Sequence, residues 1–192
     1  MKFVESSIAD IKSISQRTLA LHWSRAAAGK PVPHFQSFEI PSRGHDPNYM
    51  AIWRVQRSVT GPVFSAIFQG AYIATAFRQR WEGRKMEELI PKSLRAPALD
   101  AARFCAEKQV GVYMIYTTLD SDGRRIDCER LLLPFATPDS RVGVLLATME
   151  AISLKGYVVL SKALDHFERS YDIAFAGCFS PQPRSVAFQA NH

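Results

Sequence analysis

The segment from residue 111 to residue 150 constrains the fold most, because its residue pattern predicts three consecutive antiparallel strands. Two runs rich in β-branched, aromatic and aliphatic residues flank the tetrapeptide Asp-Ser-Asp-Gly at 120–123, a polar cluster that suits a reversing turn. The apolar run at 142–150 supplies the third strand. No catalytic signature lies in this segment, so we interpret the meander as a scaffold.

An N-terminal helix is predicted before this meander. Ser7 followed by Asp10 matches a capping box, and apolar residues then recur at helical spacing. The sequence Gly-Lys-Pro at 29–31 ends the pattern, so we expect a helix over residues 7–28.

The region between that helix and the meander combines a hairpin with short helices. Partial alternation over 49–59 and over 63–68, separated by Thr-Gly-Pro, predicts two paired strands. Apolar residues at intervals of three and four then predict helices over 70–80, 86–90 and 97–107. Two strands, several short helices and three further strands make an α+β domain.

The chain after the meander predicts a second amphipathic helix over 156–172, with a short strand at 157–160 as the competing interpretation. From residue 177 onwards, two prolines and a polar end predict a disordered tail. The expected organisation is an N-terminal helix at 1–30, a central domain at 31–152, a helical extension at 153–176 and the tail at 177–192.

Cysteine and histidine spacing argues against a disulfide framework and a metal centre. Cys105, Cys128 and Cys178 lie far apart without a CxxC pair, and no two histidines have the spacing of a metal motif. We expect buried or neutral cysteines. The longest apolar stretch, at 62–77, is too short and polar to cross a bilayer, and the N-terminus lacks signal-peptide features. We therefore expect a soluble, cytoplasmic protein with no membrane association.

The net charge of +6 comes wholly from the first half of the chain, where residues 1–96 hold 14 Lys or Arg against 7 Asp or Glu. The densest cluster, at 78–85, has Trp81 between basic residues. A solvated loop is the favoured interpretation. The alternative is a stacking platform beside phosphate contacts.

Three motifs in this chain go beyond general patterning. They run from Phe68 to Ile73 (Phe-Gln-Gly-Ala-Tyr-Ile), from Trp81 to Leu89 (Trp-Glu-Gly-Arg-Lys-Met-Glu-Glu-Leu) and from Glu129 to Pro134 (Glu-Arg-Leu-Leu-Leu-Pro). With the order of elements, they resemble a bacterial PAS-domain family of small, often stand-alone proteins, over about residues 20–150.

Each shared feature has a physical reason. Gly70 permits a close backbone approach as the strand passes into the helices, and we expect Gly83 to end a helical segment. Pro134 has no amide hydrogen for a sheet and is expected to end the fourth strand. The chain departs from the family pattern at Ile67, where an arginine is expected, and at Phe135, where leucine is usual.

The resemblance implies a five-stranded antiparallel sheet with short helices on one face, flanked by the N- and C-terminal amphipathic helices. It also implies a non-enzymatic sensory or regulatory module that signals through protein contacts, with a small apolar ligand between sheet and helices as an option. The hydrophobic core is the alternative role for each candidate pocket residue. These candidates are Phe68, Phe77, Trp81, Phe104, Tyr113, Ile115, Leu131, Leu133 and Leu145.

Cofactors and partners follow from the same resemblance. Flavin photosensors of this fold carry a reactive cysteine followed closely by arginine, whereas Cys105 lies in Arg-Phe-Cys-Ala-Glu, which argues against flavin. Residues 47–165 contain no histidine, which argues against histidine-ligated haem. The cofactor stays unknown. The two amphipathic helices either form a homodimer contact or pack against the outer face of the sheet, and an unidentified signalling protein is the expected partner.

Two other classes of function were weighed. The first is a nucleotide or nucleic-acid binder that uses the basic first half, and the second is a small cavity enzyme with Asp127 and Glu129 as an acid–base pair. We expect these carboxylates to form exposed cross-strand pairs with neighbouring arginines, so no catalytic residue is assigned. The basic candidates are Arg54, Arg57, Arg78, Arg80, Arg84 and Lys85.

Overall fold

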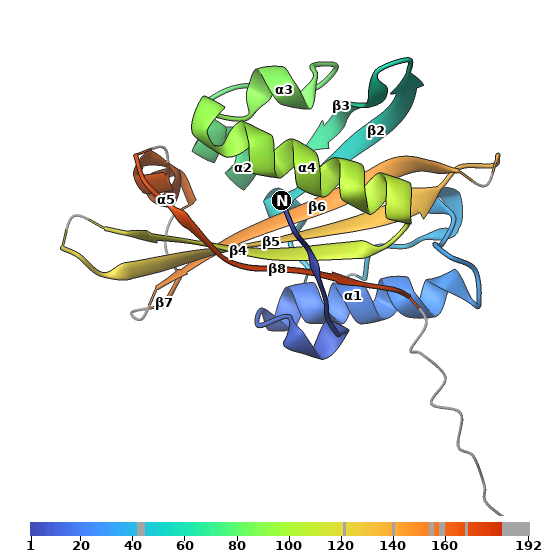
Figure 1. Ribbon diagram of the computed structural model, residues 1–192, viewed down its shortest axis with the longest axis horizontal. Helices are drawn as coiled ribbons and strands as arrows, with labels where there is room; N and C mark the ends of the chain where they lie inside the picture. Colours follow the sequence, from blue (N-terminus) through green and yellow to red (C-terminus); the bar gives the residue numbers. More distant parts are fainter. Residues whose placement is uncertain are drawn as a thin grey trace, which may run out of the picture.

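One eight-stranded sheet forms the centre of the protein in the computed structural model, which describes residues 1–41, 45–120, 122–139, 141–153, 156–157, 160–167 and 169–181 (Figure 1). Seven strands follow one another in the order β1-β8-β4-β5-β6-β2-β3, and β7 pairs with β6 beside this path. The strands are β1 (Val4–Glu5), β2 (Met50–Ser58), β3 (Gly61–Gln69), β4 (Gly111–Leu119), β5 (Arg125–Ala136), β6 (Val142–Ser153), β7 (Gly156–Tyr157) and β8 (Asp172–Phe179).

Strands β3, β2, β6, β5 and β4 form a continuous antiparallel sheet, which is the PAS-like arrangement. The predicted hairpin is β2–β3, with Ser58 opposite Gly61 at its turn, and the predicted meander is β4–β5–β6. The fold class and these five strands are confirmed. The sheet is larger than predicted, because β8 and β1 extend it beyond β4.

Helices cover both faces of this sheet (Figure 1). The face that contacts α4 also carries α2 and α3, with α5 at one end, while α1 lies on the opposite face. Buried apolar residues from both layers form a continuous core with the strands. The helices are α1 (Ile14–Ala27), α2 (Ala71–Phe77), α3 (Met86–Leu89), α4 (Lys92–Lys108) and α5 (Leu160–Phe167), with short 3-10 turns at Ile8–Asp10, Phe35–Ser37 and Pro47–Tyr49.

The N-terminal helix begins later than the capping box suggested. Ser7 and Asp10 do form a reciprocal capping box, but it caps only the 3-10 turn Ile8–Asp10. Ser13 then caps α1, its hydroxyl accepting from the amide of Gln16. The helix packs on the sheet, where the indole Nε1 of Trp23 donates to the carbonyl of Pro134 at 2.8 Å. Of the two roles that the sequence left open for this helix, packing against the sheet is observed for α1.

The predicted C-terminal helix over 156–172 was wrong in extent. The structure has the two-residue strand β7, then α5, and then β8, which enters the sheet between β4 and β1. The predicted tail from 177 was also wrong for its first residues, because Gly177 pairs with Tyr113 and Phe179 with Gly111 in the sheet. Residues 182–192 lie outside the described residues.

The residues singled out in the family motifs have partly different roles. At Gly70 a Cβ atom would lie 2.2 Å from the carbonyl oxygen of Pro47, so the close approach is confirmed. Gly83 has a φ of +77° in a turn and does not cap α2, whose C-cap is Arg78. Pro134 lies inside β5 and does not end it; it is tolerated because the pairing of β5 with β4 stops at Leu132.

Among the described residues, no helix combines the length and apolar character needed to cross a bilayer.

Candidate ligand cavity

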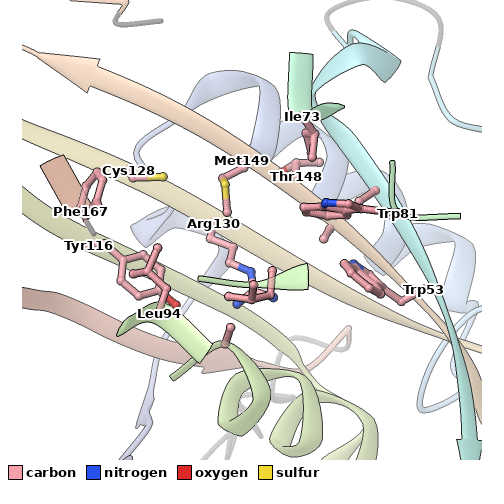
Figure 2. Close-up of a pocket in the computed structure, with 14 residues that line it drawn as sticks. Trp53, Ile73, Trp81, Leu94, Tyr116, Cys128, Arg130, Thr148, Met149 and Phe167 are labelled. Carbon is pink, nitrogen blue, oxygen red and sulfur yellow. The ribbon is translucent and has the colours of Figure 1, made fainter. Parts of the chain in front are cut away.

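A small cavity lies between the sheet and the helical layer, with a volume of about 40 Å³, room for a few water molecules (Figure 2). Strands β2, β4, β5 and β6 form its floor, and side chains from α2, α4 and α5 and from the loop before α3 close it. Its walls are almost entirely apolar. The lining residues are Ala51, Trp53, Ile73, Trp81, Ile90, Leu94, Ala98, Tyr116, Cys128, Arg130, Ala147, Thr148, Met149 and Phe167.

A cluster of aromatic rings forms one wall. The rings of Trp53 and Trp81 lie 5.1 Å apart at 39°, and Phe77 meets Trp81 edge-on at 4.7 Å. Trp81 comes from a loop that β3 holds in place. Gln69 accepts from the Trp81 amide with its carboxamide oxygen and donates to the carbonyl of Gln79. The loop therefore carries a buried tryptophan at a fixed position.

The cavity also contains one charged side chain, Arg130 of β5, which is only 5% exposed. Figure 2 shows it between Tyr116 on one side and the Trp53–Trp81 pair on the other. The Tyr116 hydroxyl is a hydrogen-bond partner of its guanidinium, and among the side chains that the structure describes no carboxylate forms an ion pair with it. Its sequence neighbour Glu129 alternates to the opposite face of the sheet, where it bonds to Ser13 and Tyr113.

The ionisable groups around Arg130 are neutral. Burial raises the pKa of the Tyr116 phenol, and the Arg130 charge opposes part of this rise. Burial likewise raises the pKa of the Cys105 thiol. It raises the pKa of the Cys128 thiol to about 12, and the Arg130 charge opposes part of both rises. These groups stay protonated near neutral pH, so none of them supplies the negative charge that would balance the guanidinium.

A second donor in the cavity has no partner. The indole Nε1 of Trp81 is buried and makes no hydrogen bond to the protein, although the whole residue is only 2% exposed. Buried polar atoms without partners are rare and call for an explanation, such as water or a ligand. The cavity thus joins two types of hydrogen-bond donor, an indole and a guanidinium, to apolar walls.

The structure places the nine predicted pocket residues at different sites, and only Trp81 lines the cavity. Phe77 supports Trp81, Phe104 stacks on Phe3 at 4.4 Å, Leu145 pairs with Trp53 in the sheet, and Phe68 is half-buried near the end of β3.

Four predicted pocket residues lie on the α1 side of the sheet, away from this cavity: Tyr113, Ile115, Leu131 and Leu133. The Tyr113 hydroxyl shows this directly, since it accepts from the Lys12 amide just before α1. The strand register then places Leu131 and Leu133 on the same side. Ligand contact by any of the nine residues stays a prediction.

Sequence reasoning missed Tyr116, Cys128, Arg130, Met149 and Phe167. A signal existed for Arg130, because a charged residue within the apolar run of a central strand is unusual. Tyr116 lies on the same face of β4 as Met114, whereas the sequence predicted a pocket lined by Tyr113 and Ile115 of the other face. Phe167 was assigned to a long helix outside the domain, so nothing directed it to the cavity.

The opposite face has a polar network that anchors α1. The Glu129 carboxylate accepts from the Ser13 amide at 2.9 Å and from the Tyr113 hydroxyl at 2.6 Å. Glu150 accepts from the hydroxyls of Ser13 and Ser15. Carboxylates at a helix N-terminus are favourable, so this network fixes the start of α1 on the sheet. It also corrects the expectation that Glu129 forms an exposed pair with neighbouring arginines.

A second cavity, of about 220 Å³, adjoins this network. Three buried atoms around it lack partners: Gln16 Oε1, His45 Nε2 and Thr148 Oγ1. Burial and the nearby His22 lower the pKa of His45, against the opposing effect of Glu150. A polar cavity of this size is suited to ordered water, which satisfies such groups.

The other candidate sites are not brought together as a functional cluster. Asp127 pairs with Arg125 at 2.7 Å and with Thr117, while Glu129 is buried in the α1 network, so the two carboxylates have separate partners. Trp81 is buried, which is incompatible with a surface platform for bases. The six basic candidates are exposed on β2 and the loop before α3. Within the described residues, no group of His, Cys, Asp and Glu has the geometry of a metal site.

No protein-family model matches the chain, and no curated protein matches it. Solved structures with a similar arrangement include an RNA-binding light-oxygen-voltage receptor, at 15% identity and a TM-score of 0.40, covering 65% of this chain and 33% of that one. VqmA bound to DPO has 11% identity and a TM-score of 0.40, covering 55% and 53%. A cysteine-to-serine mutant of Vivid has 12% identity and a TM-score of 0.40, covering 66% and 95%.

The chain therefore spans a third of the first of these proteins and about half of the second. Similarity at this level does not carry ligands or activities from one protein to another. The function of this chain has to be argued from its own residues.

Proposed function

We propose that this chain is a sensory PAS-type module that holds a small molecule in the cavity between its sheet and its short helices and signals through protein contacts. The observation that supports this most is a pair of buried donors in an otherwise apolar cavity: the Trp81 indole has no hydrogen-bond partner, and Arg130 has no carboxylate partner among the side chains that the structure describes. Binding sites for small molecules combine apolar walls with a few polar groups in this way.

Ligand entry requires movement of a wall, because about 40 Å³ is too small for an organic molecule. Helix α5 is the element whose movement would have consequences elsewhere. It contributes Phe167 to the cavity, contacts α2, and leads directly into β8 at the side of the sheet. A ligand that favours a displaced α5 would change the position of β8, which pairs with both β4 and β1.

The test is native mass spectrometry of the freshly purified protein beside the same sample after denaturation and extraction. We expect an additional mass that denaturation releases. Ala98→Leu should reduce its occupancy, because Ala98 is buried in the cavity wall, whereas Ala96→Leu on the exposed side of α4 should not. Bare wild-type protein whose melting temperature responds to no member of a fragment library would contradict the proposal.

The proposed output is contact with a protein, and a second copy of this chain is the partner that the surface of α1 favours. Ile14 and Leu21 are 73% and 42% exposed and lie seven residues apart, so they share one side of the helix. Sedimentation equilibrium should show a dimer that Leu21→Glu dissociates. A monomer at all concentrations would exclude the homodimer and direct the search to other proteins.

A further inference from the structure

We propose that the cavity ligand is a compact, largely apolar organic acid whose carboxylate pairs with the Arg130 guanidinium and accepts a hydrogen bond from the Trp81 indole. This assignment rests on the proposed function, and it adds the chemical class of the ligand. It comes from the charge, the donors and the walls of one cavity.

The charge is the first step of the argument. Arginine is almost never buried without a partner, because removing its charge from water costs several kcal/mol unless an anion balances it. Arg130 is buried in the central strand of the meander, and the described carboxylate closest to it in sequence, Glu129, is bonded on the other face. The cavity therefore has a positive charge that a bound anion would neutralise.

The second step concerns the groups around this charge. Tyr116, Cys105 and Cys128 lie around it as neutral side chains; the Tyr116 hydroxyl is a hydrogen-bond partner of the guanidinium, but none of the three supplies a negative charge. A planar guanidinium matches a carboxylate in a two-pronged geometry, which makes a carboxylate the fitting acidic group. The unpartnered Trp81 Nε1 is a donor in the same cavity, so an acceptor oxygen would satisfy it as well.

The third step concerns the rest of the ligand. Apart from Arg130, the walls are dominated by aromatic and aliphatic side chains such as Trp53, Ile73, Leu94 and Phe167. An apolar body gains from burial against these walls, and the aromatic wall favours a flat ring. Because a wall must move to admit any organic molecule, a compact body requires the smallest rearrangement of the cavity. A single aromatic ring with one carboxylate has all three properties.

Benzoate is the probe for the experiment, and benzamide is its uncharged control of nearly the same shape. With ¹⁵N-labelled tryptophan, we expect benzoate to shift the Trp81 indole resonance and to bind at least about tenfold more tightly than benzamide, the factor that about 1.4 kcal/mol of charge-assisted hydrogen bonding supplies. The indole of Trp23, which bonds to the Pro134 carbonyl on the α1 face of the sheet, provides an internal reference. This comparison uses wild-type protein, so it does not depend on a variant that folds.

Two variants assign the effect to Arg130. Arg130→Met keeps the length of the side chain without its charge and should remove the preference for benzoate while benzamide still binds. The matched control is Arg125→Met on the same strand, because Arg125 is exposed and pairs with Asp127. This control should leave both affinities unchanged.

Two results would overturn the assignment. Equal binding of benzoate and benzamide, unaffected by Arg130→Met, would show that the cavity binds small molecules without selecting anions, and the proposed function would survive. Binding of neither probe at millimolar concentration would also reject the acid, and the native mass measurement would then decide the proposed function separately.

Discussion

Arg130 illustrates how a binding residue can reduce the stability of the empty protein. A buried cation without a partner has lost its hydration and gained no anion, so an apolar side chain of similar volume should be better tolerated. We predict that Arg130→Met increases the free energy of unfolding of the ligand-free protein by about 1–4 kcal/mol. Urea denaturation measures this. Arg125→Met should change stability by less than about 1 kcal/mol, since its ion pair is exposed.

A lower stability of Arg130→Met in ligand-free protein would mean that an anionic group of the protein already balances the guanidinium, which would weaken the case for an acidic ligand. Functional residues that are suboptimal for folding are common in natural proteins.

Tyr113 has a structural role, and it makes a second prediction at the residue scale. Burial raises the pKa of its phenol and the hydrogen bond to Glu129 raises it further, so the hydroxyl stays protonated and donates to the carboxylate. Tyr113→Phe removes this donor and leaves a buried carboxylate short of one bond. We predict a loss of about 1–3 kcal/mol of stability. Thermal denaturation should show it, with the exposed Tyr72→Phe as control.

A stability for Tyr113→Phe equal to that of Tyr72→Phe would show that Glu129 does not depend on this bond.

The pair Tyr113 and Tyr116 also shows what the sequence could not provide. Alternation predicted β4 correctly, but both faces of this strand are buried, so apolar residues at odd and even positions look alike. The predicted pocket therefore mixed residues from both faces.

At the scale of elements, the sequence predicted the strands that have a strong local signal. It did not predict β8, where a helical and a strand pattern adjoin. The hairpin and meander have turn residues and alternation that agree, and both were found. Strand β8 was missed because its neighbour α5 has apolar residues at helical spacing, and the pattern was extended through Tyr171. The entry of β8 into the sheet depends on pairing with β4, a distant segment, which no local window contains.

A hydrogen bond that Pro97 explains links helix α4 to the segment before β8. Pro97 lies inside α4 and has no amide hydrogen, so the carbonyl of Ser93, four residues earlier, lacks its usual helical partner. The Tyr171 hydroxyl donates to this carbonyl at 2.9 Å. The sequence placed the start of the helix near Pro97, whereas α4 begins at Lys92 and Pro97 lies inside it.

This linkage gives a prediction at the element scale. Tyr171→Phe should reduce stability by about 0.5–1.5 kcal/mol, because the Ser93 carbonyl loses its partner. In a Pro97→Ala background the new Ala amide supplies the missing bond, so the same substitution should cost less. A double-mutant cycle by urea denaturation measures this coupling. Equal costs in the two backgrounds would show that the Tyr171 hydroxyl does not replace the missing helical bond.

At the scale of the whole molecule, the first and last strands of the described chain lie side by side in the sheet. Strand β1 pairs in parallel with β8, with Val4 opposite Gly177, and the Ser6 amide donates to the carbonyl of Cys178. The cavity is connected to this side through α5 and β8. A ligand that acts on α5 would therefore affect both the N-terminal segment and the end of β8, which is a route for a signal out of a small domain.

The three cysteines make opening of the cavity measurable, because they differ in position and reactivity. Cys178 is partly exposed in β8, whereas Cys105 and Cys128 are buried. Burial raises the pKa of Cys128 to about 12, and this cysteine also lines the cavity. Near pH 8 its thiolate is scarce in the folded state, so we predict that a thiol reagent modifies Cys178 first and Cys128 only when the protein opens.

A bound ligand should slow the modification of Cys128 in proportion to the stabilisation it provides. At a benzoate concentration of 100 times its Kd, the open state is suppressed by about 2.7 kcal/mol, which corresponds to roughly a hundredfold slower modification. Cys178 is already partly exposed in the native protein, so its modification should not show this hundredfold slowing. Mass spectrometry after timed labelling with iodoacetamide, an uncharged reagent, resolves the cysteines, and Arg130→Met should reduce the benzoate effect about tenfold at the same benzoate concentration. Modification of Cys128 as fast as Cys178, with or without benzoate, would show that the cavity is open to solvent in the native protein.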